Sequence, residues 1–181
     1  MVERLIEALR TPSEVVQVAV SECLPPLIKL RHEEAPAIID RLLHDLFYAS
    51  KYAERRGAAY GLAGCIRGRG IASIREFNII ARFRDALEDK KNATPKQGAM
   101  FAIECFTVTL GRIFEPFIVQ ILPLLLTALG DASVDVREAT SDAARAISKS
   151  TREANTTCLT NHNSGSYLRI RRQVDSSHSS R

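Results

Sequence analysis

The sequence predicts an all-α protein built from repeated helix pairs, and three observations support that fold class. Aromatic residues make up only 6% of the 181 residues and Trp is absent, so the apolar residues are mainly Leu, Ile, Val and Ala, as in stacked helices. Apolar residues recur at helical spacing along most of the chain. A short pattern also returns roughly every 40 residues, as in proteins made of stacked helix pairs.

The repeat is marked by a polar or basic residue followed two positions later by a small residue. Each small residue begins an apolar stripe at helical spacing, such as Ala19, Cys23 and Leu27 in the first repeat. We predict that these segments are the second helices of four pairs and that the architecture is of the HEAT/armadillo type. The four segments are Gln17-Val18-Ala19, Arg55-Arg56-Gly57, Lys96-Gln97-Gly98 and Arg137-Glu138-Ala139.

Each second helix is preceded by another apolar run, which we predict to be the first helix of its pair. Pro36 and Pro116 stand near helix starts, where a missing backbone N–H costs nothing. A helix pair cannot bury its apolar face alone, so the pairs should stack into a short right-handed superhelix. The predicted first helices cover residues 5–9, 36–48, 74–87 and 116–129, with turns such as 10–13 and 130–133 after them.

The repeat pattern ends near residue 150 and divides the chain into two parts. Residues 1–150 are predicted to form the solenoid, and residues 151–181 to form a disordered tail that is rich in Ser and Thr. The tail also carries most of the net charge of +4, so the charge of the whole chain is weak support for nucleic-acid binding.

The chemistry-bearing residues do not form the motif of a common enzyme class. The sequence has no phosphate-binding loop, no zinc-protease helix and no nucleophile elbow, so we expect no enzyme activity and no cofactor. Its cysteines lack a C-x-x-C pair, which favours reduced thiols in an intracellular protein, and its histidines lack ligand spacing, so we expect no metal site. We expect Cys23, Cys65 and Cys105 to form a buried row in the core.

Two further features predict how the chain packs and where it lies. Small residues at positions 57, 58, 61 and 64 should give a smooth helix face for close packing, and Gly68 and Gly70 should end that helix. The most apolar stretch, residues 117–129, is shorter than a membrane span requires, so we expect no membrane contact.

The polar and charged candidates fall into two groups. The first holds one position near the start of each second helix or in the turn before it, and we predict that it forms a structural turn ladder in which basic side chains pair with acids. The second group lies off that row in turns and is a candidate for contact with a phosphate-rich surface, the alternative being a merely solvated turn. The ladder group is Gln17, Arg55, Lys96, Asp131 and Arg137, and the phosphate-contact group is Arg67, Arg69, Lys90 and Lys91.

Several strings go beyond what helix stacking demands. In their order and spacing they resemble the elongation-factor-three-like region of the general-control translational activator family, over residues 1–150. The strings are Glu54-RRGAAYGLAG-Cys65, Glu88-DKKN-Ala93, Gly98-AMFAIE-Cys105, Leu110-GRIFEPF-Ile118, Ile121-LPLLL-Thr127 and Gly130-DASVDVREA-Thr140.

The resemblance implies a cytoplasmic, ribosome-associated HEAT scaffold without catalysis. Members of that family bind the ribosome, engage an ATP-binding-cassette partner protein and relay amino-acid starvation to the initiation-factor kinase. Residues 151–181 depart from the family pattern, so we expect a fragment or a truncated gene model. A generic HEAT adaptor that binds only proteins, of the transport or phosphatase scaffold type, stays open as an alternative. Part of an elongation-factor-three ATPase is disfavoured because no nucleotide-binding cassette follows.

Overall fold

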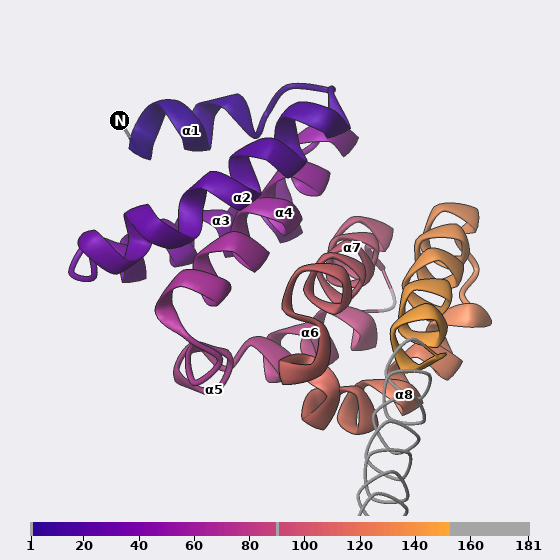
Figure 1. Ribbon diagram of the computed structural model, residues 1–181. Coiled ribbons are helices and arrows are strands. Elements are labelled where there is room, and N and C mark those ends of the chain that lie inside the picture. Colours follow the sequence, from indigo (N-terminus) through magenta and orange to yellow (C-terminus); the bar gives the residue numbers. More distant parts are fainter. Residues whose placement is uncertain (1, 90, 153–181) are drawn as a thin grey trace, which may run out of the picture. The chain divides into compact units, whose positions relative to one another are not determined.

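A computed structural model describes residues 2–89 and 91–152, and the regular secondary structure of these residues is entirely helical. Met1–Ile147 form one compact unit, and a second unit begins at Ser148. The helices of the first unit follow one another along the chain in Figure 1. They are α1 (Val2–Ala8), α2 (Glu14–Leu30), α3 (Ala35–Tyr48), α4 (Tyr52–Arg69), α5 (Ser73–Glu76), α6 (Ile79–Glu88), α7 (Ala93–Leu110), the 3-10 helix η1 (Gly111–Phe114), α8 (Glu115–Leu129) and a last helix that begins at residue 134.

These helices form four pairs, which confirms the predicted all-α, HEAT/armadillo-type solenoid. The pairs are α1 with α2, α3 with α4, α5 and α6 with α7, and α8 with the last helix. The second helices stack on one another, because α4 packs against α2 on one side and α7 on the other (Figure 1). The last helix is described through residue 152, two residues beyond the predicted boundary, and the rest of the predicted tail lies outside the described residues.

Helix α4 packs closely on the preceding pair through a stripe of glycines. Gly57, Gly61, Gly64 and Gly68 lie on one helix face, and a Cβ atom at any of them would come closer than 3.0 Å to an atom of α1, α2 or the turn between them. Gly68 was predicted to end the helix, but it is buried inside it. Gly70 ends it instead, with a φ of 106° that a residue with a side chain rarely adopts.

The buried stripe of α2 differs from the predicted one. Ala19 and Cys23 are exposed, so the expected buried row of three cysteines is wrong, and only Cys65 and Cys105 are buried. Two residues of the buried stripe, Gln17 and Ser21, are polar and donate hydrogen bonds to backbone carbonyls. The spacing of apolar residues therefore does not reveal this stripe. The side chains that α2 buries are Gln17, Val20, Ser21, Leu24 and Ile28.

The predicted helix over residues 74–87 is broken into α5 and α6. Asn78 adopts the left-handed conformation, with φ 50° and ψ 37°, and stands at the start of α6. Asn tolerates this conformation better than most residues because its short polar side chain can bond locally. The apolar pattern continues across the break, so the break leaves no trace in the hydrophobic periodicity.

The apolar core contains a chain of aromatic rings that runs from the second pair through the third pair to η1. The ring centroids of Phe47 and Phe83 lie 6.3 Å apart, those of Phe83 and Phe106 6.0 Å, and those of Phe106 and Phe114 5.5 Å. These edge-on and tilted contacts suit the quadrupoles of the rings. They tie α3, α6, α7 and η1 together around one buried centre.

Among the residues that the structure describes, one helical stretch, Ala93–Leu129, is long and apolar enough to cross a membrane by length and composition. It comprises α7, η1 and α8, and α7 ends where Gly111 adopts a positive φ. Most of α7 is buried against α3, α4 and α6. The expectation of no membrane contact stays a prediction.

Candidate functional site

The first junction between repeats is bridged by Gln17. Its Nε2 donates hydrogen bonds to the carbonyl oxygens of Leu9 at 3.0 Å and Thr11 at 2.8 Å, both in the first pair. The same atom donates to the carbonyl oxygen of Ala53, in the second pair, at 2.9 Å. The side chain is buried, and the two hydrogens of its amide are shared among these three carbonyls.

The second junction is bridged by Arg55 in the same way. One guanidinium nitrogen donates to the carbonyl oxygens of Ala49 and Ser50, each at 2.9 Å, and the other donates to Oε1 of Gln97 at 2.6 Å. Arg55 is only 8% exposed, and burial lowers its pKa from the usual value. Its two terminal nitrogens are held apart in a planar fork and donate to acceptors on both sides of the junction, whereas the donors of a lysine all lie on one nitrogen.

The third junction contains an ion pair. Nζ of Lys96 lies 2.7 Å from Oδ2 of Asp131, and both side chains are largely shielded from solvent. The Lys96 ammonium, followed by the backbone N–H of Ser133, lowers the pKa of the Asp131 carboxyl below its usual range. Arg137 completes this turn by donating to the carbonyl oxygens of Asp131 at 2.7 Å and Ala132 at 2.9 Å.

The sequence-predicted ladder residues therefore lie at the three junctions, but their partners differ from the expected acids. Among the contacts just described, only Lys96 pairs with a carboxylate, whereas Arg55 and Arg137 donate to backbone carbonyls and an amide. Gln97 is a partner that the sequence analysis missed, although it directly precedes Gly98 in the repeat pattern. Carbonyl acceptors carry no signal in the side-chain sequence.

Arg67 lies in the last turn of α4, not in a turn between helices as predicted. It is exposed and lines a surface hollow together with Lys29, which lies in the last turn of α2. Glu22, Pro25 and Pro26 complete the lining. Cations are favoured at helix C-termini because they oppose the negative end of the helix dipole. Lys29 was not among the predicted residues, and its place near the end of an apolar helix was the available signal.

Arg69 is occupied by partners within the fold. Its guanidinium donates two hydrogen bonds to the Glu76 carboxylate, at 2.8 and 3.3 Å, and one to the carbonyl oxygen of His32 at 3.1 Å. It also lies over the ring of Phe77, and its side chain is only 11% exposed. Arg69 thus joins the end of α4 to α5 and to the turn that follows α2, and it differs from the free turn cation that the sequence suggested.

The two predicted lysines lie between α6 and α7. Lys91 is exposed, and its backbone N–H donates to Oδ1 of Asp89 at 2.8 Å, which fixes the turn. Lys90 lies outside the described residues. The structure therefore places Arg67 and Lys29 in one hollow, at the ends of α4 and α2. Lys91 lies elsewhere on the chain, in the connection between α6 and α7.

A polar cluster crosses the second helices α2, α4 and α7. Arg56 lies over the rings of Tyr60 and Phe101, at 5.3 and 5.1 Å from their centroids, and forms an ion pair with Glu104. Tyr60 donates a short hydrogen bond to Glu14, and together with Arg56 this lowers the pKa of Glu14. These groups satisfy one another, so the cluster presents no free nucleophile or base.

The buried thiols are unsuited to nucleophilic chemistry. Burial raises the pKa of Cys65 to about 12, and burial likewise raises the pKa of Cys105. A thiol with so high a pKa has almost no reactive thiolate at neutral pH. Within residues 2–89 and 91–152, no three His, Cys, Asp or Glu side chains come together as a metal site would require.

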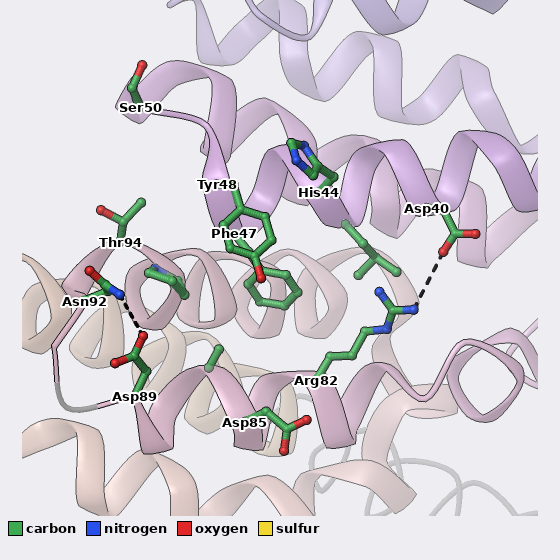
Figure 2. Close-up of a pocket in the computed structure, with 13 residues that line it drawn as sticks. Asp40, His44, Phe47, Tyr48, Ser50, Arg82, Asp85, Asp89, Asn92 and Thr94 are labelled. Atoms are coloured by element: carbon green, nitrogen blue, oxygen red, sulfur yellow. Dashed lines mark hydrogen bonds and ion pairs between the residues drawn. The ribbon is translucent and has the colours of Figure 1, made fainter.

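A groove of about 690 Å³ lies between α3, α6 and the start of α7 (Figure 2). Leu43, Phe47, Ala86 and Pro95 provide its apolar lining. Its charged and polar lining comes from Asp40, His44, Tyr48, Ser50, Arg82, Asp85, Asp89, Asn92 and Thr94.

Comparison with known proteins decides the family. The family model described as "EF3 N-terminal HEAT repeat" matches residues 55–163, which is more than half of the chain. The chain belongs to the EF3 N-terminal HEAT repeat family. Within that family, it is 48% identical over 147 residues to the stalled ribosome sensor GCN1 of Homo sapiens and 49% identical over 147 residues to the protein ILITYHIA of Arabidopsis thaliana. It is 46% identical over 148 residues to the eIF-2-alpha kinase activator GCN1 of Dictyostelium discoideum.

Each of these matches covers 81% of this chain, so the EF3-type HEAT repeats described here form a GCN1-like region. The chain spans only 6% of the length of these relatives. No solved structure matches the chain.

Proposed function

We propose that this chain is a non-enzymatic, ribosome-contacting HEAT segment that acts in translational control in the cytoplasm. Arg67, Lys29 and Lys91 contact phosphates of ribosomal RNA, and the turn ladder keeps the repeats in register behind them. Arg69 holds the end of α4 in place. In this proposal the segment also takes part in engaging an ATP-binding-cassette protein and, indirectly, the initiation-factor kinase.

The observation that carries the proposal is the pairing of Lys29 and Arg67 in one hollow. Two exposed cations from neighbouring second helices converge there, and Glu22 is the one acid among the described residues that line the hollow. A surface that concentrates positive charge attracts phosphate and releases its counterions. Similarity to proteins named as a stalled ribosome sensor and as an eIF-2-alpha kinase activator supports ribosomal RNA as the source of those phosphates.

Co-sedimentation of the full chain with purified ribosomes over a salt series tests this proposal. The test variant combines Lys29→Glu, Arg67→Glu and Lys91→Glu, all at exposed positions. Each lost phosphate contact should reduce the slope of log affinity against log salt by about 1, so the triple variant should bind weakly with a slope flatter by about 2 to 3.

A matched control reverses three exposed cations elsewhere on the chain, Arg4→Glu, Arg84→Glu and Lys149→Glu. It changes the net charge by the same amount and should leave most of the binding intact. Equal loss in both variants would mean that only net charge matters. No binding by the folded full chain would favour the adaptor that binds proteins alone.

A further inference from the structure

The groove between α3 and α6 has the chemistry of a peptide-docking surface, and it uses none of the cations of the phosphate-contact proposal. Phe47 and Leu43 are buried members of the core whose edges reach the groove, and Ala86 lies across from them on α6. Tyr48 is 69% exposed and lies beside this apolar lining (Figure 2). The centroid of its ring lies 5.2 Å from that of His44. An exposed aromatic next to an apolar hollow is typical of protein interfaces.

The rim of the groove is acidic. Asp40, Asp85 and Asp89 line it, whereas Arg82 is the one Lys or Arg among the described residues of the lining. Arg82 lies 3.8 Å from Asp40, so its charge is already directed at an acid of the rim (Figure 2). Asp89 accepts hydrogen bonds from the backbone N–H of Lys91 and from the side chain of Asn92. These bonds fix the position of its carboxylate and lower its pKa. Asp85 is exposed, and no ion pair joins it to another described residue.

We propose that this groove binds a basic segment of a partner protein, in which a large apolar side chain is flanked by Arg or Lys. The apolar side chain lies against Phe47 and Tyr48, and the flanking cations pair with Asp85 and Asp89. Charge complementarity selects this occupant, because an acidic peptide or a nucleic acid would place its negative charge against three carboxylates. A volume of about 690 Å³ is enough for a few side chains of such a segment.

The probe for this proposal is a fluorescent synthetic peptide that alternates Arg with Leu. Its affinity for the full chain is measured by fluorescence anisotropy, beside a counterpart with Glu in place of Arg and a single-stranded RNA oligomer. The Arg–Leu peptide should bind with an affinity that weakens as salt rises. The Glu–Leu peptide and the RNA should not compete for the same site.

Two variants at exposed positions test the residues. Asp85→Asn should weaken binding about fivefold, since one exposed charge pair contributes up to about 1 kcal/mol. Tyr48→Ser should weaken it by roughly tenfold, since aromatic anchors are often the dominant side chains of an interface. Glu33→Gln, which removes an exposed acid outside the groove, is the matched control and should leave the affinity unchanged.

Loss of affinity in both groove variants with an unchanged control would establish the site. Affinity that falls equally in all three variants would show general attraction to a negative surface and would overturn the proposal. Displacement of the Arg–Leu peptide by the RNA oligomer or by the Glu–Leu peptide would overturn it as well. Circular dichroism of each variant confirms that the helices are intact, so a loss of binding reports on the groove.

Discussion

Gly57 shows how a single residue sets the distance between two repeats. A Cβ atom there would come closer than 3.0 Å to the carbonyl oxygen of Leu9, which belongs to the backbone and cannot swing away. Glycine in a helix interior costs about 1 kcal/mol relative to alanine, so the close approach of α4 to the first pair has to outweigh that loss.

Gly57→Ala should therefore lower the free energy of unfolding by about 2 kcal/mol, the typical cost of overpacking, despite the better helix propensity of alanine. Chemical denaturation followed by circular dichroism measures the change. Gly130→Ala is the control, because its φ is −94° and its nearest neighbour, the carbonyl oxygen of Thr127, would lie 3.7 Å from the new Cβ. A Gly57→Ala protein as stable as the Gly130→Ala protein would contradict this account of α4.

Asp131 predicts a pH dependence at the third junction. Its folded-state pKa is lowered, chiefly by Lys96, so its carboxylate stabilises the fold at any pH above the unfolded pKa of about 3.9. That stabilisation is lost as the pH falls through the folded pKa, because the acid must then take up a proton. Asp131→Asn should cost about 1 kcal/mol at neutral pH, and the difference from the parent chain should shrink as the pH falls below about 4.

The measurement is the free energy of unfolding of both proteins from neutral pH down to the acid limit of the fold. Asp142→Asn is the comparison, because Asp142 forms a more exposed pair with Arg145 within one helix. It should change stability little at any pH. A difference between the parent and Asp131→Asn that stays constant below the unfolded pKa would show that the carboxylate is not what stabilises the junction.

At the scale of the helices, the four-pair order follows from apolar period, small-residue anchors and prolines near helix starts. The predictions that were wrong concern buried polar side chains and one local backbone conformation. Gln17 and Ser21 belong to the buried stripe of α2 because backbone carbonyls meet them there. Asn78 breaks α5 from α6 through a left-handed backbone conformation that interrupts no hydrophobic pattern.

The candidate site was harder to predict than the helices because its partners come from other repeats. Arg67 and Arg69 are two residues apart on α4 and looked equivalent in the sequence. The structure gives Arg69 the Glu76 carboxylate and the His32 carbonyl, and leaves Arg67 exposed beside Lys29. Which of two neighbouring cations is available thus depends on the helix that packs opposite, which periodicity does not reveal.

Helix α8 offers a test of which of its faces stabilises the fold. Leu125 is 3% exposed and Leu126 is 71% exposed, although they are neighbours in an apolar sequence. Leu125→Ala should lower the free energy of unfolding by about 2 to 5 kcal/mol through lost burial and a residual cavity. Leu126→Ala should change it by less than about 0.5 kcal/mol.

Denaturant titrations measure the free energy of unfolding of both variants. Each variant loses the same atoms, so the difference between them reports on burial alone. Equal losses would mean that the exposed face of α8 is covered in the folded chain. That face carries Val119, Leu122, Leu126 and Leu129, so the outcome reports on a continuous apolar stripe.

Over the whole of Met1–Ile147, stability should be carried by contacts between neighbouring pairs. In stacks of helix pairs each unit touches mainly the next, so damage at one junction is felt first by the units beside it. The three junctions use different chemistry: an amide to a carbonyl at the first, a guanidinium to an amide at the second and an ammonium to a carboxylate at the third. The third junction can therefore be weakened without touching the other two.

Lys96→Met removes the ammonium and keeps an apolar stem, so it should loosen the fourth pair alone. Hydrogen exchange followed by mass spectrometry should show protection falling about fivefold in α8 and in residues 134–147, the equivalent of about 1 kcal/mol, while α3 and α4 keep theirs. Lys51→Met, at an exposed Lys that pairs with Glu54 within one turn, should alter neither region. An equal loss of protection from α2 to the last helix would instead mean that the four pairs unfold as one cooperative unit and that no junction fails independently.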